Sequence, residues 1–241
     1  MRCEVVTAAP EVLSGWSQTS MIGRGQAAGA LEVVCWDVRE YGLGSYGAID
    51  DYPYGGGAGM LLRPEPLAAA IEAAVAADPR PARTLLLCPQ GEVFSQTKAR
   101  ELADCERLVL VCGRYEGLDE RVREALIDEE ISVGDYVLTG GELAAMVVIE
   151  ATARLQPGVL GDLESTSEES HSEPLLEYPQ YTRPAVWRGH EVPEVLLAGH
   201  HERVRLWRRQ EQLRRTLERR PDLAAHWRPS EEDRRLLARI V

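Results

Sequence analysis

The sequence predicts an α/β protein with a largely parallel sheet, followed by a small all-α domain. Three observations support this prediction. Apolar runs of strand length alternate with helical segments over residues 1–156, which is typical of β-α-β units and a parallel sheet. Residues 157–181 are rich in proline, glycine and polar residues, which indicates a linker. In the remaining segment, 182–241, apolar residues recur three and four positions apart from Val192 onward, which indicates helices.

Local signals predict the individual elements. The strands are apolar runs bounded by turn residues, and we expect them at 2–7, 31–38, 84–88, 107–112 and 131–133. The helices show apolar residues at helical spacing, and we expect them at 22–28, 64–77, 95–103, 118–127 and 141–155. Pro64 and Pro66 fit a first helical turn, where the amide hydrogen is not needed. Pro89 is expected to end the strand before it, because proline cannot continue a ladder.

The composition is that of an ordinary folded protein. The 241 residues are 44% hydrophobic and 27% charged, enough to bury a sizeable core. No apolar run approaches the roughly 18 residues that cross a bilayer, and the N-terminus does not resemble a signal peptide. We therefore expect a cytoplasmic protein with no membrane partner. The five cysteines form no Cys-x-x-Cys pair, which favours free structural thiols over a metal site or disulfides.

The net charge alone does not identify the partner. A formal net charge of -12 argues against nucleic acid, because phosphate contacts need Lys or Arg. The charges are unevenly distributed, however. Residues 162–177 hold six acids and no base, whereas residues 183–220 hold ten arginines and five glutamates. Arginine is suited to bidentate phosphate contacts, so the C-terminal segment remains a candidate surface for nucleic acid.

Three glycine-containing segments each follow a predicted strand. They are residues 86–91 (LLCPQG), 113–117 (GRYEG) and 133–141 (VGDYVLTGG). Glycine lets a ligand approach the backbone closely, and cofactors bind at the carboxyl ends of strands in open α/β sheets. Segment 133–141 could surround an adenine through main-chain contacts, which need no particular side chains. A fourth segment, 54–60 (YGGGAGM), is not a phosphate-binding loop, because no Gly-Lys-Ser/Thr follows it.

Together and in this order, these segments resemble the bacterial tRNA (guanine-N1)-methyltransferases, members of the SPOUT superfamily. The resemblance covers nearly the whole chain. It implies a SPOUT-type, largely parallel sheet with a deep trefoil knot that holds S-adenosylmethionine bent. The implied domains are a knotted cofactor-binding domain over 1–156, a linker over 157–181 that carries the base, and a tRNA-binding helical domain over 182–241. The implied cofactor contacts are Leu87, Pro89, Gly113, Tyr115, Glu116, Ser132, Val133, Gly134, Asp135, Tyr136, Val137, Leu138, Gly140 and Gly141.

The reaction that this resemblance implies needs a base and a cation. Guanine N1 carries a proton at neutral pH, which a carboxylate could remove, and charge developing on O6 calls for a nearby cation. The family gives these roles to an aspartate in the linker and an arginine at the end of the preceding helix. Arg154 matches the arginine. Where the family has Glu-Asp-Ser-Phe, this chain has Glu168-Glu169-Ser170-His171, so Glu169 is the expected base and Glu168 the alternative.

The resemblance also implies substrate contacts and partners. The target base would contact the glycine-rich segment, and the tRNA anticodon stem-loop would contact the arginine-rich C-terminal segment. The candidate substrate-binding residues are Tyr54, Gly55, Gly56, Gly57, Ser165, Arg183 and Arg208. Magnesium would be a further cofactor, with Glu116 and Glu169 as its candidate ligands. The active form is expected to be a homodimer.

We therefore expect an enzyme that transfers the methyl group of S-adenosylmethionine to N1 of the guanosine at position 37 of tRNA. Two alternatives remain open. The chain could bind tRNA and the cofactor with weak or no catalysis, because Glu169 and His171 differ from the family pattern. It could also be a SPOUT methyltransferase that acts on a different tRNA nucleotide.

Overall fold

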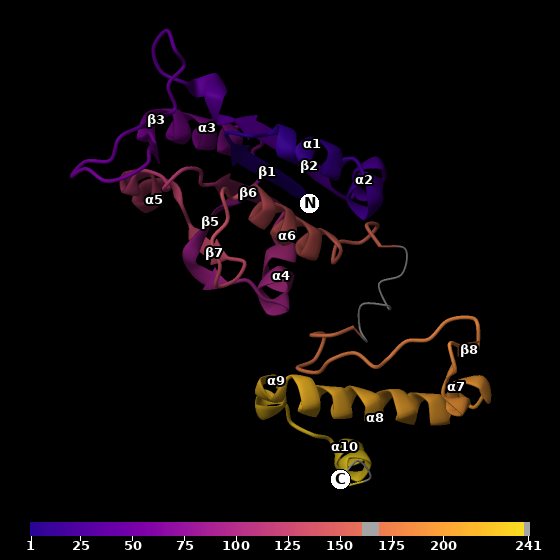
Figure 1. Ribbon diagram of the computed structural model, residues 1–241. Coiled ribbons are helices and arrows are strands. Elements are labelled where there is room, and N and C mark those ends of the chain that lie inside the picture. Colours follow the sequence, from indigo (N-terminus) through magenta and orange to yellow (C-terminus); the bar gives the residue numbers. More distant parts are fainter. Residues whose placement is uncertain (161–168, 239–241) are drawn as a thin grey trace. The chain divides into compact units, whose positions relative to one another are not determined.

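The computed structural model describes residues 1–160 and 169–238 of the chain (Figure 1). The chain divides into two compact units, Met1–Gly161 (unit 1) and Asp162–Val241 (unit 2), which are described separately below. Residues 161–168 and 239–241 lie outside the described part. The candidate residues Ser165 and Glu168 fall in the first of these two ranges.

Unit 1 is built around a five-stranded parallel sheet. Its strands are β1 (Arg2–Thr7), β2 (Glu32–Asp37), β5 (Ala82–Val93), β6 (Arg107–Cys112) and β7 (Glu129–Ser132). Their order across the sheet is β2-β1-β6-β5-β7, and every neighbouring pair runs parallel. The predicted α/β class with a largely parallel sheet is thereby confirmed. Central strand β6 is buried at all its residues, as expected for a parallel sheet covered on both faces.

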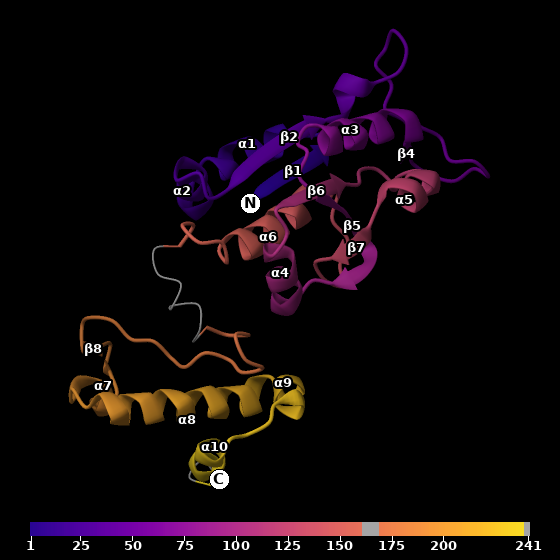
Figure 2. The ribbon, with the colours of Figure 1, turned by 180° about the vertical axis from the view of Figure 1, so that it is seen from behind.

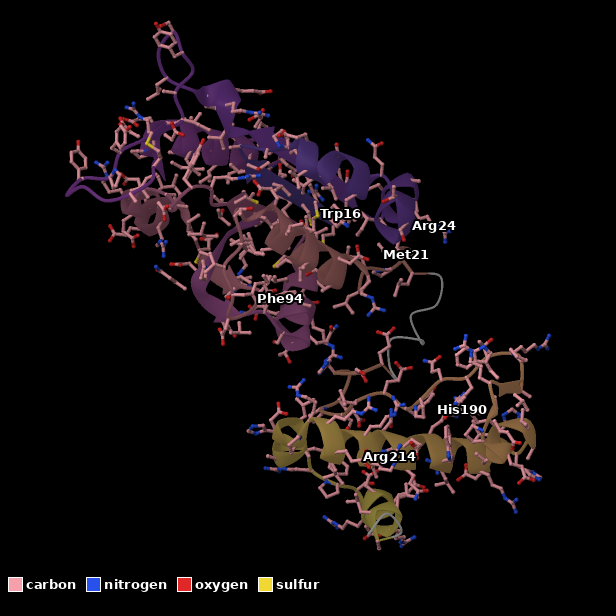
Figure 3. The ribbon with its side chains drawn as sticks, viewed as in Figure 1. Trp16, Met21, Arg24, Phe94, His190 and Arg214 are labelled. Carbon is pink, nitrogen blue, oxygen red and sulfur yellow. The ribbon has the colours of Figure 1, made fainter. Side chains whose placement is uncertain are left out.

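Helices cover both faces of this sheet (Figures 1 and 2). One face carries α1 (Glu11–Ser17), α2 (Ser20–Ala27), α4 (Gln96–Ala103) and α6 (Glu142–Ala153). The other carries α3 (Pro64–Ala76), α5 (Glu120–Leu126) and the 3-10 helix η1 (Val38–Tyr41). Side chains of β6 alternate between the two cores: Leu108 and Leu110 join the first, Val109 joins the second. Trp16 and Phe94 pack against the first core (Figure 3).

Strand β5 is longer than the sequence predicts. It continues to residue 93, and its Leu87 and Glu92 both lie opposite Ile131 of β7, so the residues between them bulge from the ladder. Pro89 lies in this bulge, where no ladder hydrogen bond is required of it. Gly91 lies against β7, because a Cβ there would be 2.3 Å from its backbone. The prediction that Pro89 ends the strand was therefore wrong.

A fully buried ion pair joins the sheet to the end of α3. The side chains of Glu4 and Arg107 are both 0% exposed, and Arg107 Nη2 lies 2.6 Å from Glu4 Oε2. The same guanidinium donates hydrogen bonds to the carbonyls of residues 74, 75, 78 and 80. Carbonyls at the end of a helix lack helical partners, so this arginine satisfies them while it holds α3 against β1 and β6.

Unit 2 is helical, with one short hairpin. Its elements are β8 (Val186–Trp187), β9 (His190–Glu191), α7 (Glu194–Leu197), α8 (His201–Arg219), α9 (Pro221–His226) and α10 (Glu231–Leu237). Its core contains Leu213 of α8 and Leu236 of α10, together with Leu175 from the predicted linker. Leu176 N also donates to Thr216 Oγ1 at 2.8 Å. The end of the predicted linker is therefore packed onto α8 as part of unit 2.

Apart from the end of β5, the predicted helices and strands begin and end within two residues of those in the structure. The shorter elements were not predicted. Helix α1 went unpredicted because it buries only Leu13 and contains Gly15, which lowers helix propensity. The two-residue strands β3 (Asp50–Asp51) and β4 (Leu61–Leu62) are too short to show periodicity. No helix in residues 1–160 or 169–238 has the length and apolar character needed to cross a membrane.

Candidate functional site

A cavity of about 220 Å³ opens at the carboxyl ends of β5, β6 and β7. Three segments supply most of its lining, and they are the segments in which the sequence predicts cofactor contacts. The predicted contacts that line it are Leu87, Pro89, Gly113, Tyr115, Glu116, Ser132, Val133, Gly134, Tyr136, Val137, Leu138, Gly140 and Gly141. Asp135 belongs to the third segment but is not one of the lining residues.

The second segment (113–117) and the third segment (133–141) are hydrogen-bonded to each other through their backbones. Gly141 N donates to Gly113 O at 3.0 Å, and Arg114 and Gly140 form an isolated antiparallel bridge. The two chains are so close that a Cβ at position 141 would lie 2.7 Å from Cα of Cys112. The backbone conformation does not require glycine at 141, because its φ of -78° is accessible to any residue. It is the close approach of the two chains that requires it.

A buried carboxylate holds the side chain of Arg114 at the edge of the cavity. Glu142, in the first turn of α6, is 2% exposed, and its Oε1 accepts hydrogen bonds from Arg114 Nε at 3.0 Å and Thr7 Oγ1 at 2.6 Å. Gly140 makes room for this pair, since a Cβ there would lie 2.4 Å from Glu142 Oε2. The end of β1, the second segment and the start of α6 are thereby joined.

The glycine-rich segment 54–60 lies beside the second segment without lining the cavity. Residues 55–57 and Gly59 all have positive φ, which glycine adopts at no steric cost. A Cβ on Gly59 would lie 2.4 Å from Cγ of Glu116, and Glu116 N donates to Met60 O at 3.1 Å. Tyr54, at the start of the segment, is 100% exposed. The exposure of Tyr54 fits a loop that is open to a large substrate. The loop contacts Glu116, which lines the cavity.

Tyr115 has an unusual backbone conformation for a residue with a side chain. Its φ is 58°, in the left-handed region, and its ring is half-exposed at the cavity. A hydrogen bond to Asp50 of β3 and partial burial raise the pKa of Tyr115. The phenol therefore stays protonated at neutral pH and ties the second segment to β3.

The two candidate catalytic residues lie in different units. Arg154 is half-buried at the C-terminus of α6, where its N donates to Glu150 O at 3.3 Å. Glu169 is half-buried in unit 2. Its carbonyl accepts hydrogen bonds from N and Oγ of Ser172, at 3.1 and 2.7 Å, and this turn fixes its backbone. His171 lies in the same turn with a φ of 69°.

A second cavity, of about 680 Å³, lies within unit 2 and contains Glu169 in its lining. Tyr178 and Arg208 also line it, and Arg208 Cζ lies 4.7 Å from the centroid of the Tyr178 ring, a cation-π distance. Tyr181 and Trp207 form a neighbouring aromatic pair with ring centroids 6.3 Å apart. Unit 2 therefore brings an aromatic ring and an arginine to the cavity that the candidate base also lines.

Several arginines of α8 are already bound to acids within unit 2. Arg205 pairs with Glu202 and Glu232, Arg209 with Glu173 and Asp233, and Arg214 with Glu211 and Glu218 (Figure 3 labels Arg214). The sequence count of arginines did not distinguish these internal pairs from side chains available to phosphate. Arg183, in contrast, is exposed in the segment that leads to β8.

Comparison with known proteins decides the family. The family model described as tRNA (Guanine-1)-methyltransferase TrmD matches residues 1–226. The chain belongs to the TrmD family. A tRNA (guanine-N(1)-)-methyltransferase of Chloroflexus aurantiacus is 59% identical over 93% of this chain and 88% of its own length. The protein of that name from Dehalococcoides mccartyi strain 195 is 52% identical over 100% and 97%, and that from Moorella thermoacetica is 54% identical over 100% and 96%.

Within this TrmD-family chain, sequence reasoning missed Arg114, which lines the cavity, and its supports Glu142 and Thr7. Arg114 lies inside the GRYEG segment, yet nothing in the sequence indicates its partner. Thr7 and Glu142 are separated by 135 residues, so only the fold reveals their hydrogen bond. The glutamate in the first turn of a predicted helix was the available signal, but such residues usually serve as exposed dipole partners.

We expect Gly141→Ala to destabilise unit 1 of this TrmD-family protein by about 1–3 kcal/mol, because the new methyl group would overlap the backbone of Cys112. Urea denaturation followed by circular dichroism measures this loss. The matched control is Gly15→Ala in α1, where a Cβ meets nothing within 4 Å and helix propensity improves. Equal stability of the Gly141→Ala variant and the wild type would show that the two segments separate easily.

Proposed function

We propose that this chain transfers the methyl group of S-adenosylmethionine to N1 of the guanosine at position 37 of tRNA, in the cytoplasm. Membership of the TrmD family supports guanine-N1 methylation of tRNA. The observation that carries the proposal in this chain is the cavity formed by the three predicted segments at the carboxyl ends of β5, β6 and β7. Cofactor sites in open α/β sheets lie at this edge.

The lining of this cavity suits S-adenosylmethionine. Leu87 and Leu138 provide apolar surface, and the glycines at 134, 140 and 141 leave backbone groups accessible to an adenine. Tyr136 contributes an aromatic ring whose hydroxyl donates to Val133 O at 3.1 Å. When bound, S-adenosylmethionine supplies the electrophilic methyl group of its sulfonium.

Two side chains are assigned to the reaction of the guanine, one as a base and one as a cation. We assign Glu169 as the general base that accepts the proton of N1, so that the N1 lone pair can attack the methyl carbon. We assign Arg154 as the cation that stabilises the negative charge developing on O6. The turn around Glu169 supports the first assignment, because its two hydrogen bonds from Ser172 hold the carboxylate on a fixed backbone.

The domain roles follow the two units. Residues 1–156 would bind the cofactor within a deep trefoil knot, and the hydrogen bond that joins Gly141 to Gly113 supports a tight crossing of these segments. Residues 157–181 would carry the base, and residues 182–241 would bind the anticodon stem-loop. Tyr54 with glycines 55–57, Ser165, Arg183 and Arg208 would contact the tRNA. The exposure of Tyr54 and Arg183 supports such contacts.

We propose that the active form is a homodimer in which one subunit's cofactor segments meet the other subunit's Glu169 segment. Helix α6 supports an interface, because its exposed side carries two large apolar residues. Its inner side is buried in the core of unit 1, while Leu143 and Val147, one turn apart, are 54% and 47% exposed. Such a helix normally has a partner on its second side. Leu143→Glu combined with Val147→Glu should give a monomer in sedimentation analysis.

Magnesium would be a further cofactor in this proposal. Among the described residues, no group of three or more His, Cys, Asp or Glu side chains is placed to hold a metal ion. Magnesium usually keeps several waters and binds through one or two carboxylates, so Glu116 and Glu169 remain candidate ligands. No step proposed above depends on the ion.

The decisive experiment measures methyl transfer from labelled S-adenosylmethionine to unmodified tRNA with guanosine at position 37. We expect transfer to this tRNA and none when position 37 is adenosine. Transfer to the adenosine variant would instead identify a methyltransferase of another nucleotide. Binding of both tRNA and cofactor without transfer would identify the binding-only alternative, which Glu169 and His171 favour because they depart from the family pattern.

A further inference from the structure

We propose that Thr216 of α8 positions the turn that carries Glu169. Residues 169–177, called the base turn below, would then be held by the same helix that is expected to bind tRNA. Thr216 would act through the backbone of the base turn and would contact no reacting atom, so it is a positioning residue. This inference rests on the proposed function, because it concerns the side chain assigned there as the base.

The hydroxyl group of Thr216 links α8 to the base turn. The residue is 1% exposed. Its Oγ1 donates to Gln212 O, one helical turn earlier, at 2.7 Å, and accepts a hydrogen bond from Leu176 N at 2.8 Å. A hydroxyl has one donor and two acceptor sites, so the donated bond fixes the direction of its hydrogen and leaves a lone pair for Leu176. The backbone of the base turn is therefore hydrogen-bonded to a buried side chain of α8.

An apolar contact supports the same attachment. Leu175 is 4% exposed and shares the core of unit 2 with Leu213 of α8 and Leu236 of α10. Leu213 lies three residues before Thr216, and residues three apart are neighbours on the surface of a helix. The base turn therefore meets one face of α8 through a side chain and a backbone amide, and Figures 1 and 2 show the chain running along this helix.

Hydrogen bonds within the base turn extend this constraint to Glu169. Ser170 Oγ accepts a hydrogen bond from Glu177 N at 2.9 Å, which joins the two ends of the turn. The carbonyl of Glu169 accepts two more hydrogen bonds, from N and Oγ of Ser172. The residue that Thr216 binds directly precedes Glu177. The backbone of Glu169 is therefore connected to α8 through a closed turn.

The attachment matters for the reaction, because proton transfer to the base depends on its position. A misplacement of about 1 Å can lower a rate roughly a hundredfold. Glu169 lines the cavity of unit 2 together with Arg208 of α8, so a tRNA bound to this helix would meet a base whose position the helix sets. Loss of the Thr216 hydroxyl should therefore slow the reaction of bound tRNA, while the arginines of α8 remain in place to bind it.

Thr216→Val tests the proposal, because valine has nearly the shape of threonine and cannot accept the hydrogen bond. Single-turnover methyl transfer would be measured on the full-length protein, with saturating S-adenosylmethionine and tRNA that has guanosine at position 37. We expect the rate to fall by roughly tenfold to a hundredfold, whereas the Kd for tRNA should stay within a few-fold. Thr216→Ser keeps the hydroxyl and should recover the rate to within a few-fold of the wild type.

Hydrogen exchange followed by NMR gives a readout that does not depend on activity. In the wild type, the amides of Leu176 and Glu177 should exchange slowly, because both donate hydrogen bonds within unit 2. In Thr216→Val these two amides should exchange roughly tenfold faster, while the amides of α8 keep their protection. Thr216→Ser should exchange as the wild type does.

A second variant tests the closed turn without changing α8. Ser170→Ala removes the acceptor of Glu177 N and should lower the single-turnover rate to a similar extent. The matched control is Ser230→Ala, which removes the side-chain acceptor that caps α10 in the same unit. The control should lose stability, because an N-cap hydrogen bond is lost, and should keep the rate within a few-fold of the wild type.

The outcomes separate this inference from the proposed function. A wild type whose Leu176 amide is protected but that transfers no methyl group would overturn the function and the inference with it. An active wild type whose Leu176 amide exchanges freely, or an unchanged rate in Thr216→Val, would overturn only the role of Thr216.

Two further results would also contradict the role of Thr216. A similar loss of rate in Thr216→Val, Thr216→Ser and Ser230→Ala would show that these substitutions only weaken the fold of unit 2. If Thr216→Val does not fold, Ser170→Ala decides, and a wild-type rate in that variant would show that the closed turn does not position the base.

Discussion

Replacing Glu169 with alanine is expected to abolish turnover, with a fall in kcat of roughly a hundredfold to ten-thousandfold, the usual contribution of a general base. Guanine N1 cannot attack the methyl group while it carries its proton, and water is a poor substitute for a positioned carboxylate. The affinity for S-adenosylmethionine should stay within a few-fold, because Glu169 belongs to unit 2 and the cofactor cavity is built from unit 1. Single-turnover methyl transfer and calorimetry measure the two quantities.

The control for this variant is Glu231→Gln. Glu231 is an acid in the same unit, paired with Arg235 at the surface, and both side chains are largely exposed. It should keep kcat within a few-fold. The Glu169→Asp variant adds a second comparison, because it keeps the carboxylate and shortens the side chain by one methylene. If Glu169→Ala instead loses cofactor affinity, the residue has a structural role and another group removes the proton.

Replacing Arg107 with alanine is expected to destabilise unit 1 by about 3–5 kcal/mol, the cost of breaking a buried ion pair by removing one partner. Glu4 is 0% exposed, and the Arg107 guanidinium is its closest cation, at 2.6 Å. Arg2 Nε lies 3.1 Å from the other carboxylate oxygen and would remain. The variant also leaves the carbonyls of residues 74 and 80 without this donor. A loss of this size corresponds to a fall of roughly 10 °C in melting temperature for a protein of this length.

Thermal and urea denaturation of Arg107→Ala would measure this effect, with Arg80→Ala as the control. Arg80 is half-exposed and pairs with Asp78 at the surface, where an ion pair contributes about 0–1 kcal/mol. Replacing Glu4 and Arg107 together with methionine should recover part of the stability, because no charge is then left buried. A single Arg107→Ala variant as stable as the control would show that Arg2 or entering water compensates the charge of Glu4.

The sequence predicted most elements of unit 1 because their signals are local. Strands β1 and β6 match their predicted bounds, since each is an apolar run that is buried on both faces of a parallel sheet. Strand β5 was cut short because the rule that proline ends a ladder ignores bulges. The bulge exists only because β7 pairs with β5 on both sides of it, which is a contact between distant segments.

In the candidate site too, the sequence predicted the residues with local signals and missed those that depend on contacts between distant segments. Glycines 113, 140 and 141 could be selected from the sequence, because a glycine after an apolar strand is a visible signal. The anchoring of Arg114 by Glu142 could not, because that pair is 28 residues apart and depends on where α6 begins relative to β6. Leu175 looked like part of a polar linker, yet it belongs to the core of unit 2.

The amino-acid sequence by itself determined the fold class, the order of the three cavity segments and the resemblance that leads to the family. These depend on residue type and short-range spacing, which are written along the chain. Only the tertiary structure decided which charges are paired: Glu4 with Arg107, Glu142 with Arg114, and Asp233 with Arg209. Side chains meet there because strands and helices from distant positions pack together, and no local pattern encodes that meeting.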